Sequence, residues 1–385
     1  MMLTRFLIIT ALLFSAGLSF SSEQNPRING VQVFVLNKSY DGDMDAFFSG
    51  LKAKGYDTVM LRVFHNGGDR YHFAGENADC KSGVYFKTDR ACVVRDVLGE
   101  ASVSARKNGM RIYAWMATRS LSFLKTPEHM EKVFTPEGTA EGYGASVFDK
   151  EVRAELKGLF ADLAKYDIDG ILFQDDFIMR YAEGASDDAV ALYEAETGNK
   201  LAYDTLFSCS GSYPVTRVSN ACGETFLYWV RWKNAKLMDF FGELKSSAMA
   251  VNPDMKFAAN VYYETPIDKT KGLAWYSQSI QSMLAAGFDY LAVMGYHDQI
   301  ATEMRKETDE AVDVLYEMAE NLVAAADDEN RIILKLQITS FDKKRKIDDS
   351  QIDLLCRMTA DYPGISRVLV PVNSLSDIKD ICFSN

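Results

Sequence analysis

The sequence predicts an α/β fold, a (β/α)8 barrel built as a single domain with long rim loops. Two observations favour it: eight short, β-rich apolar runs recur along the chain, and segments with helical periodicity separate them. Strands that alternate with helices pair in parallel, and eight such repeats close into a barrel. An open doubly wound sheet would use fewer strands and a Gly-rich phosphate loop, and the sequence contains no such loop.

The expected elements follow one another in the order that a barrel requires. Strands are expected at 31–36, 58–64, 111–117, 170–175, 257–263, 290–296, 332–339 and 367–372. Helices are expected at 43–54, 152–166, 226–250, 275–285 and 307–325. Two further connections, 65–95 and 177–224, are too long for simple loops, and the second has room for a short helix. Both follow strands, so we expect them at the C-terminal rim, where barrel active sites lie.

The bulk composition is that of a folded protein with an acidic surface. The chain has 385 residues, of which 48% are hydrophobic and 25% charged, so disorder is not expected. A net charge of -12 disfavours binding to a polyanion such as nucleic acid. A neutral or cationic ligand suits the chain better. No motif for a cofactor is present, and none is predicted.

The N-terminal segment has the pattern of a secretory signal peptide. Arg5 precedes an almost wholly apolar run at 6–18, and Ser19 and Ser21 supply small residues for cleavage. An uncleaved membrane anchor is the alternative, but the run is shorter than the ~20 residues that a bilayer span needs. We therefore expect a signal peptide at 1–21 and one barrel domain at 22–385. The mature chain would be periplasmic or secreted, with no stable membrane insertion; its oligomeric state is not indicated.

Six cysteines can pair in the oxidising compartment that export implies. Proximity in the sequence favours three local disulfides, although other pairings stay open. The predicted pairs are Cys80–Cys92, Cys209–Cys222 and Cys356–Cys382. Metal binding is the rival interpretation. No CxxC or HxxxH spacing supports it, and the four histidines are scattered, so no metal site is predicted.

Polar and aromatic side chains gather at the ends of the expected strands. Because these ends meet at one rim of a barrel, their side chains are candidates for a single site. The fourth strand supplies Gln174, Asp175 and Asp176; the fifth supplies Asn260, Tyr262 and Glu264, with Trp275 following; the sixth supplies Tyr296, His297 and Asp298; the others supply Arg62, His65, Trp115, Arg119, Gln337 and Asn373.

These acidic and aromatic residues are the kinds that glycoside hydrolysis requires. That reaction needs one carboxylic acid to protonate the departing oxygen, one carboxylate to attack or to activate water, and aromatic faces for sugar rings. We expect Asp175 to be the main catalytic carboxylate, with Asp176 or Asp298 as its partner and Glu264 in reserve. Substrate contacts are expected from Trp115, Tyr262, Trp275 and Tyr296 by stacking, and from Arg62, Arg119, Gln174, Asn260, His297 and Gln337 by hydrogen bonding.

Structural roles are the alternative for each of these residues. An Asp at a strand end is more often a helix N-cap or a turn residue than a catalyst. Strand alternation also sends Asp175 and Asp176 to opposite sides, so only one need face the mouth. The aromatic residues could belong to the core, and His297 could be a satisfied loop histidine. The convergence of acids from three strands favours a catalytic site over these structural roles.

The order of motifs also resembles a known family. The matching stretches are "GVYFKTDRACVVRD", "RIYAWMATRSL", "DGILFQDDF", "AANVYYETP", "WYSQSI", "FDYLAVMGYHD" and "ILKLQITSFD". They are similar to the hydrolase domain at the C-terminal end of PgaB-type poly-β-1,6-N-acetylglucosamine N-deacetylases, glycoside hydrolase family 153. The resemblance implies a (β/α)8 barrel that cuts partially de-N-acetylated poly-β-1,6-N-acetylglucosamine, a biofilm polysaccharide. It places the family's acidic motif on Asp175 and Asp176, and a further acid on Asp298.

Two departures from the family pattern bear on activity. Gln174 stands where the family has His before the paired acids, and 295–298 replaces a longer Met-Pro-Tyr-Met-Glu stretch. No deacetylase domain or His-rich metal motif is expected, so deacetylase activity is not predicted. The leading hypothesis is an exported, endo-acting hydrolase of an amino-sugar polysaccharide, retaining or inverting. The alternatives are a catalytically silent carbohydrate-binding barrel and a hydrolase of another glycan, such as an α-glucan, with Glu264 as the acid.

Overall fold

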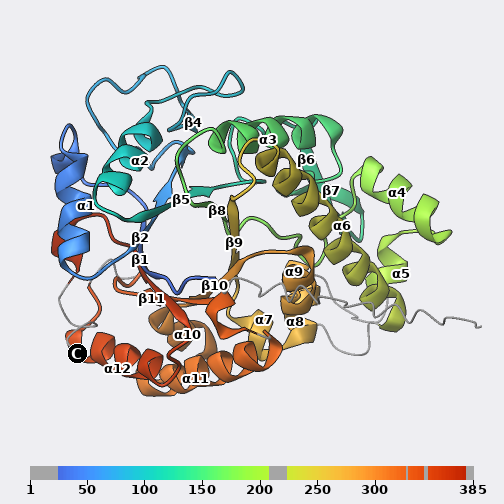
Figure 1. Cartoon of the computed structure of the whole chain (residues 1–385). Helices are drawn as coiled ribbons and strands as arrows, with labels where there is room; N and C mark the ends of the chain where they lie inside the picture. The colour runs from blue at the N-terminus through green and yellow to red at the C-terminus, as the bar shows by residue number, and fades with distance from the viewer. Residues whose placement is uncertain (1–24, 208–222, 327, 342–345, 379–385) are drawn as a thin grey trace, which may run out of the picture.

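Eight parallel strands close into a barrel, as the sequence predicts (Figure 1). The computed structural model describes residues 25–207, 223–326, 328–341 and 346–378. Around the barrel the strand order is β1-β12-β11-β10-β9-β8-β5-β2. The bounds are β1 Asn29–Val33, β2 Thr58–Arg62, β5 Arg111–Met116, β8 Gly170–Phe173, β9 Lys256–Val261, β10 Tyr290–Gly295, β11 Ile332–Gln337 and β12 Ser366–Val370. Each of the eight apolar runs contributes one strand.

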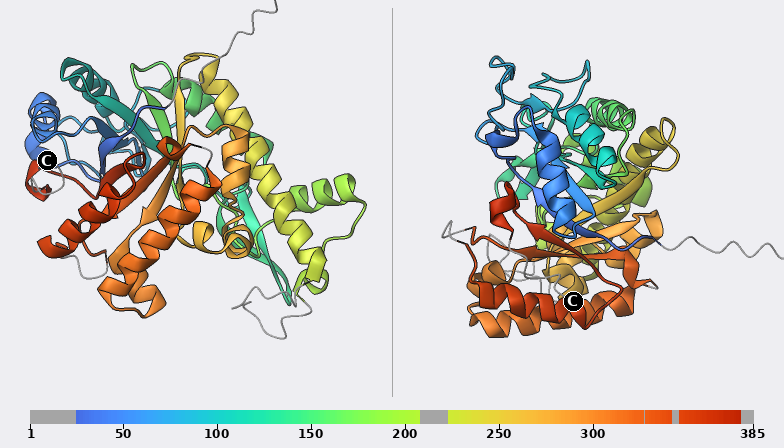
Figure 2. Two further views of the ribbon diagram at one scale, coloured as in Figure 1. Left: turned by 60° about the horizontal axis from the view of Figure 1, so that its bottom comes forward. Right: turned by 60° about the vertical axis from the view of Figure 1, so that its left-hand side comes forward.

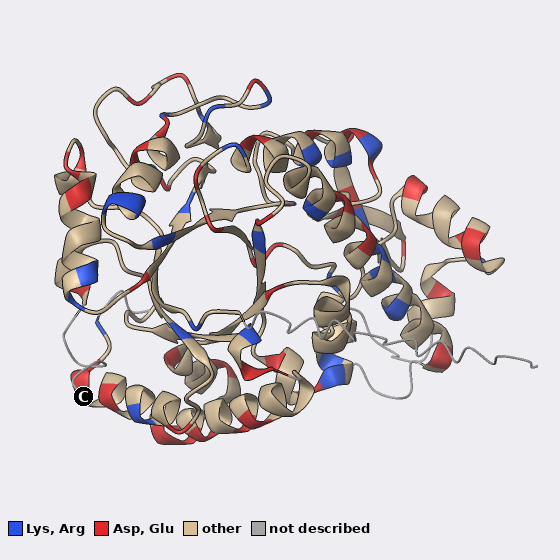
Figure 3. Cartoon of the chain, in the orientation of Figure 1, with Lys and Arg blue, Asp and Glu red and all other residues tan. Residues whose placement is uncertain are grey.

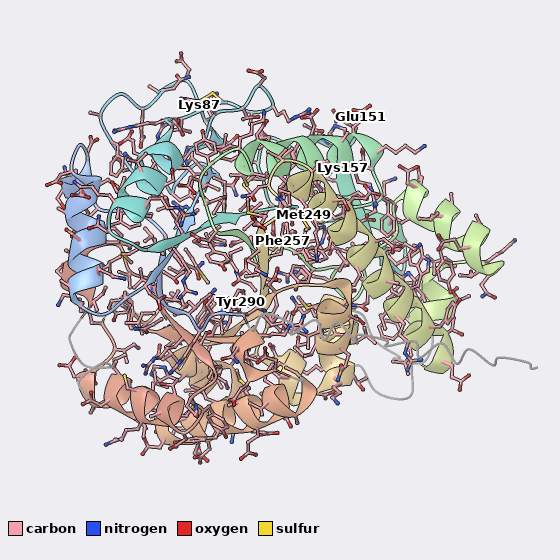
Figure 4. The ribbon with its side chains drawn as sticks, viewed as in Figure 1. Lys87, Glu151, Lys157, Met249, Phe257 and Tyr290 are labelled. Carbon is pink, nitrogen blue, oxygen red and sulfur yellow. A yellow bond between two sulfur atoms is a disulfide. The ribbon has the colours of Figure 1, made fainter. Side chains whose placement is uncertain are left out.

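The strand register decides which side chains point into the barrel. Residues paired in a parallel sheet point to the same side, and Arg62, Trp115 and Leu172 lie in register across β2, β5 and β8. The rings of Tyr113 and Tyr290 come from non-adjacent strands and still lie 6.2 Å apart, so these residues face the interior. Figure 4 shows that side chains occupy the ring of strands. The barrel is therefore a packed core, and ligands can reach only its ends.

Helices surround the barrel and begin where the sequence supplies a capping acid. Asp43, Asp96 and Asp149 each accept a hydrogen bond from a backbone N–H in the first turn of α1, α2 and α3. The helices are α1 Met44–Ala53, α2 Val97–Lys107, α3 Lys150–Leu163, α4 Asp187–Thr197, α5 Tyr203–Phe207, α6 Gly223–Met249, α7 Glu264–Ile267, α8 Lys269–Tyr276, α9 Ile280–Ala286, α10 His297–Met304, α11 Thr308–Ala325 and α12 Asp349–Ala360. Short 3-10 turns occur at Lys38–Tyr40, Glu329–Arg331 and Leu375–Asp377.

The helix expected at 275–285 is wrong, because the chain forms two helices there. α8 ends at Tyr276 and α9 begins at Ile280. Between them Ser277 adopts a left-handed conformation with φ of 53°, and its hydroxyl donates to the carbonyl of Met179. Polar contacts to a distant loop thus end the first helix although the hydrophobic pattern continues.

The structure contains a hairpin at the rim that the sequence analysis did not predict. Strands β6 (Met130–Thr135) and β7 (Gly138–Ala145) pair antiparallel between β5 and α3. β7 is mostly exposed and rich in glycine, so it lacks the apolar alternation that predicts a strand. Figure 2 shows the hairpin reaching away from the barrel beside α4 and α5. The connection 177–224 holds α4 and α5 rather than a single short helix, together with the start of α6.

The rim loop 65–95 carries the expected disulfide. Cys80 and Cys92 are bonded, with their Cα atoms 5.6 Å apart, and two short strands, β3 (Phe64–His65) and β4 (Gly83–Val84), pair in the same loop. Cys209, Cys222 and Cys382 lie outside the described residues, as does the expected signal peptide at 1–21. In the described part of the chain no helix combines the length and apolar character needed to cross a membrane.

We expect Gly170 to be required by barrel packing. A Cβ there would lie 2.4 Å from a ring carbon of Tyr113 and 2.5 Å from the backbone oxygen of Lys256. Gly170→Ala should therefore lower the free energy of unfolding by about 1–3 kcal/mol in urea titrations. The control is Gly242→Ala within α6, where nothing lies within 4 Å, and a gain of roughly 0.5–1 kcal/mol is expected. An equal response at both positions would contradict the packing account.

Candidate active site

Asp175 lies in a cavity at the C-terminal ends of β5, β8 and β9. The cavity has a volume of about 270 Å³. It is lined by Arg119, Ser120, Tyr143, Gly144, Gln174, Asp175, Asp176, Ile178, Arg180, Glu183 and Tyr262. Four of the residues singled out from the sequence are thus close together here around Asp175: Arg119, Gln174, Asp176 and Tyr262.

The surroundings of Asp175 favour its protonated form. Burial raises the pKa of the Asp175 carboxyl, the neighbouring charge of Asp176 raises it further, and Lys335 opposes both effects. Lys335 lies inside the barrel on β11, and burial lowers the pKa of its ammonium to about 7. A carboxyl that keeps its proton above the usual range can act as a general acid.

Asp176 has a different role from its neighbour. Its two oxygens accept hydrogen bonds from the backbone N–H groups of Thr118, Arg119 and Ser120, at 2.6–3.2 Å. The hydroxyls of Thr118 and Ser120 also donate to it, at 3.0 and 2.8 Å. Asp176 therefore ties the end of β8 to the loop after β5 and presents a fixed negative charge beside Asp175.

Gln278 fixes the end of β9. Its side-chain nitrogen donates to the backbone oxygen of Asn260 at 3.0 Å, and its side-chain oxygen accepts from the backbone N–H of Tyr262 at 3.1 Å. This is the Gln of the Trp-x-x-Gln motif, so that motif serves to position residues of the mouth. Trp275, the first residue of the motif, packs edge-on against Tyr181 with ring centroids 4.9 Å apart.

Glu264 is connected to the Asp175 cavity through two tyrosines. The hydroxyl of Tyr276 donates to Glu264 at 2.8 Å, and the Tyr276 ring stacks on Tyr262 with centroids 4.1 Å apart. Burial raises the pKa of the Glu264 carboxyl, and its hydrogen bond from Tyr276 partly offsets this. Glu264 is thus a second carboxyl with a raised pKa, and Tyr276 and Tyr262 separate it from the cavity that contains Asp175.

Asp298 lines a second cavity, of about 240 Å³, at the ends of β10 and β11. Its neighbours in that cavity are Gln299, Thr302, Glu303, Gln337 and Phe341. Asp298 accepts a hydrogen bond from the Ser340 hydroxyl at 2.6 Å. The side-chain nitrogen of Gln337 donates to Thr339, and its buried side-chain oxygen has no hydrogen-bond partner within the described chain. The cavity therefore offers carboxylates and a free acceptor.

Two further aromatic residues singled out from the sequence lie inside the mouth. Tyr296 is buried 5.2 Å from the Phe341 ring, measured between centroids, and Trp115 lies 4.8 Å from Phe34 in the same way. The indole nitrogen of Trp115 is buried without a hydrogen-bond partner in the described structure. Both rings are buried, and neither residue lines the two cavities.

Four polar residues from the strand ends are engaged elsewhere, and two of them, Arg62 and His297, were predicted to bind substrate. Arg62 forms an ion pair with Asp69 at 2.9 Å, and His65 contacts the same carboxylate at 2.9 Å, so both hold the loop after β2. His297 is fully buried and turns toward Gln351 of α12. Neither Arg62 nor His297 joins the residues that line the two cavities. Asn373 accepts from the backbone N–H groups of Phe34 and Val35 and so fixes the end of β1.

Arg119 acts as a buried anchor at the edge of the cavity. Its guanidinium donates to Glu183 at 2.7 Å and 3.1 Å, and both side chains are almost completely buried. Glu183 also accepts from the backbone N–H groups of Tyr143 and Arg180. The pair holds the β6–β7 hairpin against the loop after β8. It thereby places Tyr143, 54% exposed, under the Arg180 guanidinium at 4.3 Å from the ring centroid.

A third hollow lies away from the strand ends. Its volume is about 920 Å³, and it is formed by the 87–90 loop, Asp96, Tyr166 and the outer side of α3. Its charged groups pair with one another, as in Lys87–Asp96 and Arg90–Glu155. Figure 4 shows Lys87 at the outer edge of the molecule. The smaller cavities at the barrel mouth have the convergent carboxyl groups that chemistry needs.

Breaking the Arg119–Glu183 pair should destabilise the fold strongly. Glu183→Gln leaves a buried guanidinium without its counter-charge, and a loss of about 3–5 kcal/mol in the free energy of unfolding is expected from urea titrations. Asp187→Asn is the matched control, because Asp187 is 96% exposed and pairs with Lys132 at the surface. That change should cost less than about 1 kcal/mol.

Stability should depend on pH through Glu264. Its folded-state pKa is raised, so the folded state binds this proton more tightly than the unfolded state, and stability falls as pH rises above the usual value of 4.5. Glu264→Gln removes that loss, and the variant should melt at a higher temperature than the parent at pH 7 but not at pH 4. Glu196→Gln is the opposite case: a hydrogen bond from Lys236 lowers the pKa of Glu196, so its replacement should lower the melting temperature at pH 7.

Comparisons with known proteins agree with the barrel fold. Two curated poly-β-1,6-N-acetyl-D-glucosamine N-deacetylases, from Escherichia coli strain K12 and from O157:H7, are each 27% identical over 314 residues. The match covers 79% of this chain and 42% of each relative, so the chain spans less than half of their length. The PgaB (BpsB) glycoside hydrolase domain from Bordetella bronchiseptica superposes with a TM-score of 0.72 at 20% identity, over 92% of this chain and 97% of that domain.

More distant barrels show the same fold. The catalytic domain of a β-amylase from Paenibacillus polymyxa superposes with a TM-score of 0.55 at 12% identity, over 93% of this chain and 95% of that one. The model of the family described as hypothetical glycosyl hydrolase family 13 matches residues 37–362, which include every strand of the barrel except β1 and β12. The chain therefore belongs to this glycosyl hydrolase family.

Proposed function

We propose that the chain is an exported, endo-acting hydrolase of an amino-sugar polysaccharide such as partially de-N-acetylated poly-β-1,6-N-acetylglucosamine. One observation carries the proposal: Asp175, a carboxyl with a raised pKa, stands beside the fixed charge of Asp176 in a cavity at the strand ends. In the proposed mechanism Asp175 protonates the departing glycosidic oxygen, and the adjacent negative charge stabilises the positive charge that develops on the sugar ring.

The second carboxylate of the reaction is Asp298 in this proposal. The oxygens of Asp176 already accept hydrogen bonds from three backbone N–H groups and two hydroxyls, which suits a fixed charge better than a group that must attack or activate water. Asp298 lies in the first turn of α10, just after β10, and lines the neighbouring cavity. Replacing Asp298 should then abolish turnover, whereas replacing Asp176 should also loosen the loop at 118–120.

Charge supports a polymer that carries free amines. Glucosamine units are cationic near neutral pH, and the chain has a net charge of -12, with acidic residues on outer helices such as α4 and α11 (Figure 3). In the second cavity Asp298 and Glu303 provide carboxylates, and Gln337 provides an acceptor for an ammonium group. The N-deacetylase name of the curated relatives points to the same polymer class. The apolar N-terminal run and the Cys80–Cys92 disulfide support export.

The central test compares the parent protein with Asp175→Asn on partially deacetylated polymer. Loss of a general acid should reduce depolymerisation by about 10²–10⁴-fold, measured by release of reducing ends. Asp353→Asn, an exposed position on α12, is the control and should keep full activity. Cleavage that survives in Asp175→Asn would remove Asp175 from the mechanism.

The same assay separates the alternatives. Binding of polymer by the parent protein without any cleavage would indicate a carbohydrate-binding barrel. Cleavage of neutral glucans, lost in Glu264→Gln and retained in Asp175→Asn, would indicate a hydrolase of another glycan.

A further inference from the structure

Two arginines line the cavity that contains Asp175, and they are engaged differently. Arg119 is almost completely buried, and its guanidinium donates to two backbone oxygens and to the carboxylate of Glu183. Arg180 is exposed, and among the described residues its guanidinium has no hydrogen bond and no ion pair. That guanidinium lies over the ring of Tyr143, 4.3 Å from the ring centre. Of the two arginines, Arg180 is therefore the one whose N–H donors are available to a ligand.

Buried charged groups fix the backbone that carries Arg180 and Tyr143. The carboxylate of Glu183, which is fully buried, accepts hydrogen bonds from the backbone N–H groups of Arg180 at 2.7 Å and of Tyr143 at 3.1 Å. The ammonium of Lys233, also fully buried, donates to the backbone oxygen of Arg180 at 2.9 Å. The guanidinium of Arg180 thus extends from a rigid segment, as a preorganised binding group does.

Gln174 adds a hydrogen-bond acceptor to the same cavity. It follows directly after β8, and its side-chain oxygen is buried without a hydrogen-bond partner in the described chain. A buried acceptor without a partner is destabilising, so a donor supplied by a ligand would relieve that cost. The cavity therefore presents N–H donors from Arg180 and an open acceptor from Gln174.

These two residues favour a neutral ligand group that both donates and accepts hydrogen bonds. The free amine of a sugar unit is an ammonium near neutral pH, so it can donate to Gln174 but is repelled by Arg180. A carboxylate is attracted by Arg180, but it has no proton to donate to Gln174 and meets the fixed charge of Asp176. An acetamido group has one N–H, one carbonyl oxygen and no charge. Of these three sugar substituents, the acetamido group alone suits both residues.

We propose that Arg180 and Gln174 form a recognition site for an N-acetylated sugar unit beside Asp175. The guanidinium of Arg180 donates to the acetamido carbonyl oxygen, and the side-chain oxygen of Gln174 accepts from the acetamido N–H. Tyr143 holds the guanidinium in place through the face of its ring. This site rests on the proposed function and deepens it, because it specifies which unit of a mixed polymer lies at the candidate acid.

The test measures binding of two pentasaccharides of β-1,6-linked glucosamine, one fully N-acetylated and one fully de-N-acetylated. Both carry sulfur in place of the glycosidic oxygens so that they stay intact, and dissociation constants are obtained by calorimetric titration near pH 7. Arg180→Gln should weaken binding of the acetylated compound by about tenfold or more, because a hydrogen bond from a charged donor is lost. Binding of the de-N-acetylated compound should be unchanged or tighter, because the repulsion is removed.

Two further variants separate the roles of charge and hydrogen bonding. Arg180→Lys keeps the positive charge and should still disfavour the de-N-acetylated compound, although the acetylated compound should bind less tightly than to the parent protein. Gln174→Leu removes the buried acceptor and should also weaken binding of the acetylated compound. Arg90→Gln is the matched control: it removes the same charge from an arginine that pairs with Glu155 at the third hollow, and it should leave both dissociation constants unchanged.

Equal losses for both compounds in Arg180→Gln would indicate a structural effect and overturn the proposal, as would unchanged affinities or no binding of either compound. Because no turnover is measured, this result is separate from the proposed hydrolysis. A selective loss supports the recognition site even if the protein cleaves no polymer. The lack of a selective loss overturns the recognition site even if polymer is cleaved.

Discussion

The candidate site depends on the way one carboxylate is held beside another. Two adjacent acids at the end of a buried strand repel each other and lose hydration, which would destabilise the rim. Asp176 avoids that cost because the backbone N–H groups of residues 118–120 converge on its oxygens. The loop after β5 thus stabilises the charge of Asp176, and that charge helps Asp175 to keep its proton. The unusual pair is tolerated because the two side chains have different surroundings.

Buried ionic contacts at the edge of the cavity keep this geometry in place. Arg119 belongs to the loop whose backbone N–H groups bind Asp176. Its guanidinium pairs with Glu183 in the connection after β8. Lys233 of α6 binds three carbonyls of the same connection. Arg119 and Lys233 fix the backbone on both sides of Asp175 without contacting the Asp175 carboxyl. The rim can therefore carry long loops and a polar hairpin while the reacting group stays within a rigid frame.

Local patterns in the sequence explain why much of this could be predicted and some could not. Strand apolarity and helical periodicity are local, so the eight strands and four of the five expected helices were predicted correctly, whereas α2, α10 and α12 were not expected. Lys335 was overlooked because a lysine in an apolar run looks like an interruption of the hydrophobic pattern. It lies two residues before Gln337 on the same strand, and this spacing indicates that both side chains face the same side of the sheet. Tyr143 was overlooked because β7 has no apolar alternation, and Arg180 was overlooked because it lies in the long connection after β8. His297 and Arg62 looked like ligands because position along a strand does not specify direction after the strand ends.

The sequence by itself determined the barrel, since the apolar runs and the helical periodicity that produce alternating strands and helices act over a few residues. It also determined that acids gather at the strand ends, because parallel closure brings every C-terminal end to one rim. Only the tertiary structure decided the roles of those acids. Asp176 is hydrogen-bonded, Asp175 is buried near a cation, and Glu264 is linked to tyrosines. These surroundings depend on residues distant in the chain. Burial and neighbouring charge set the proton affinity of each carboxyl.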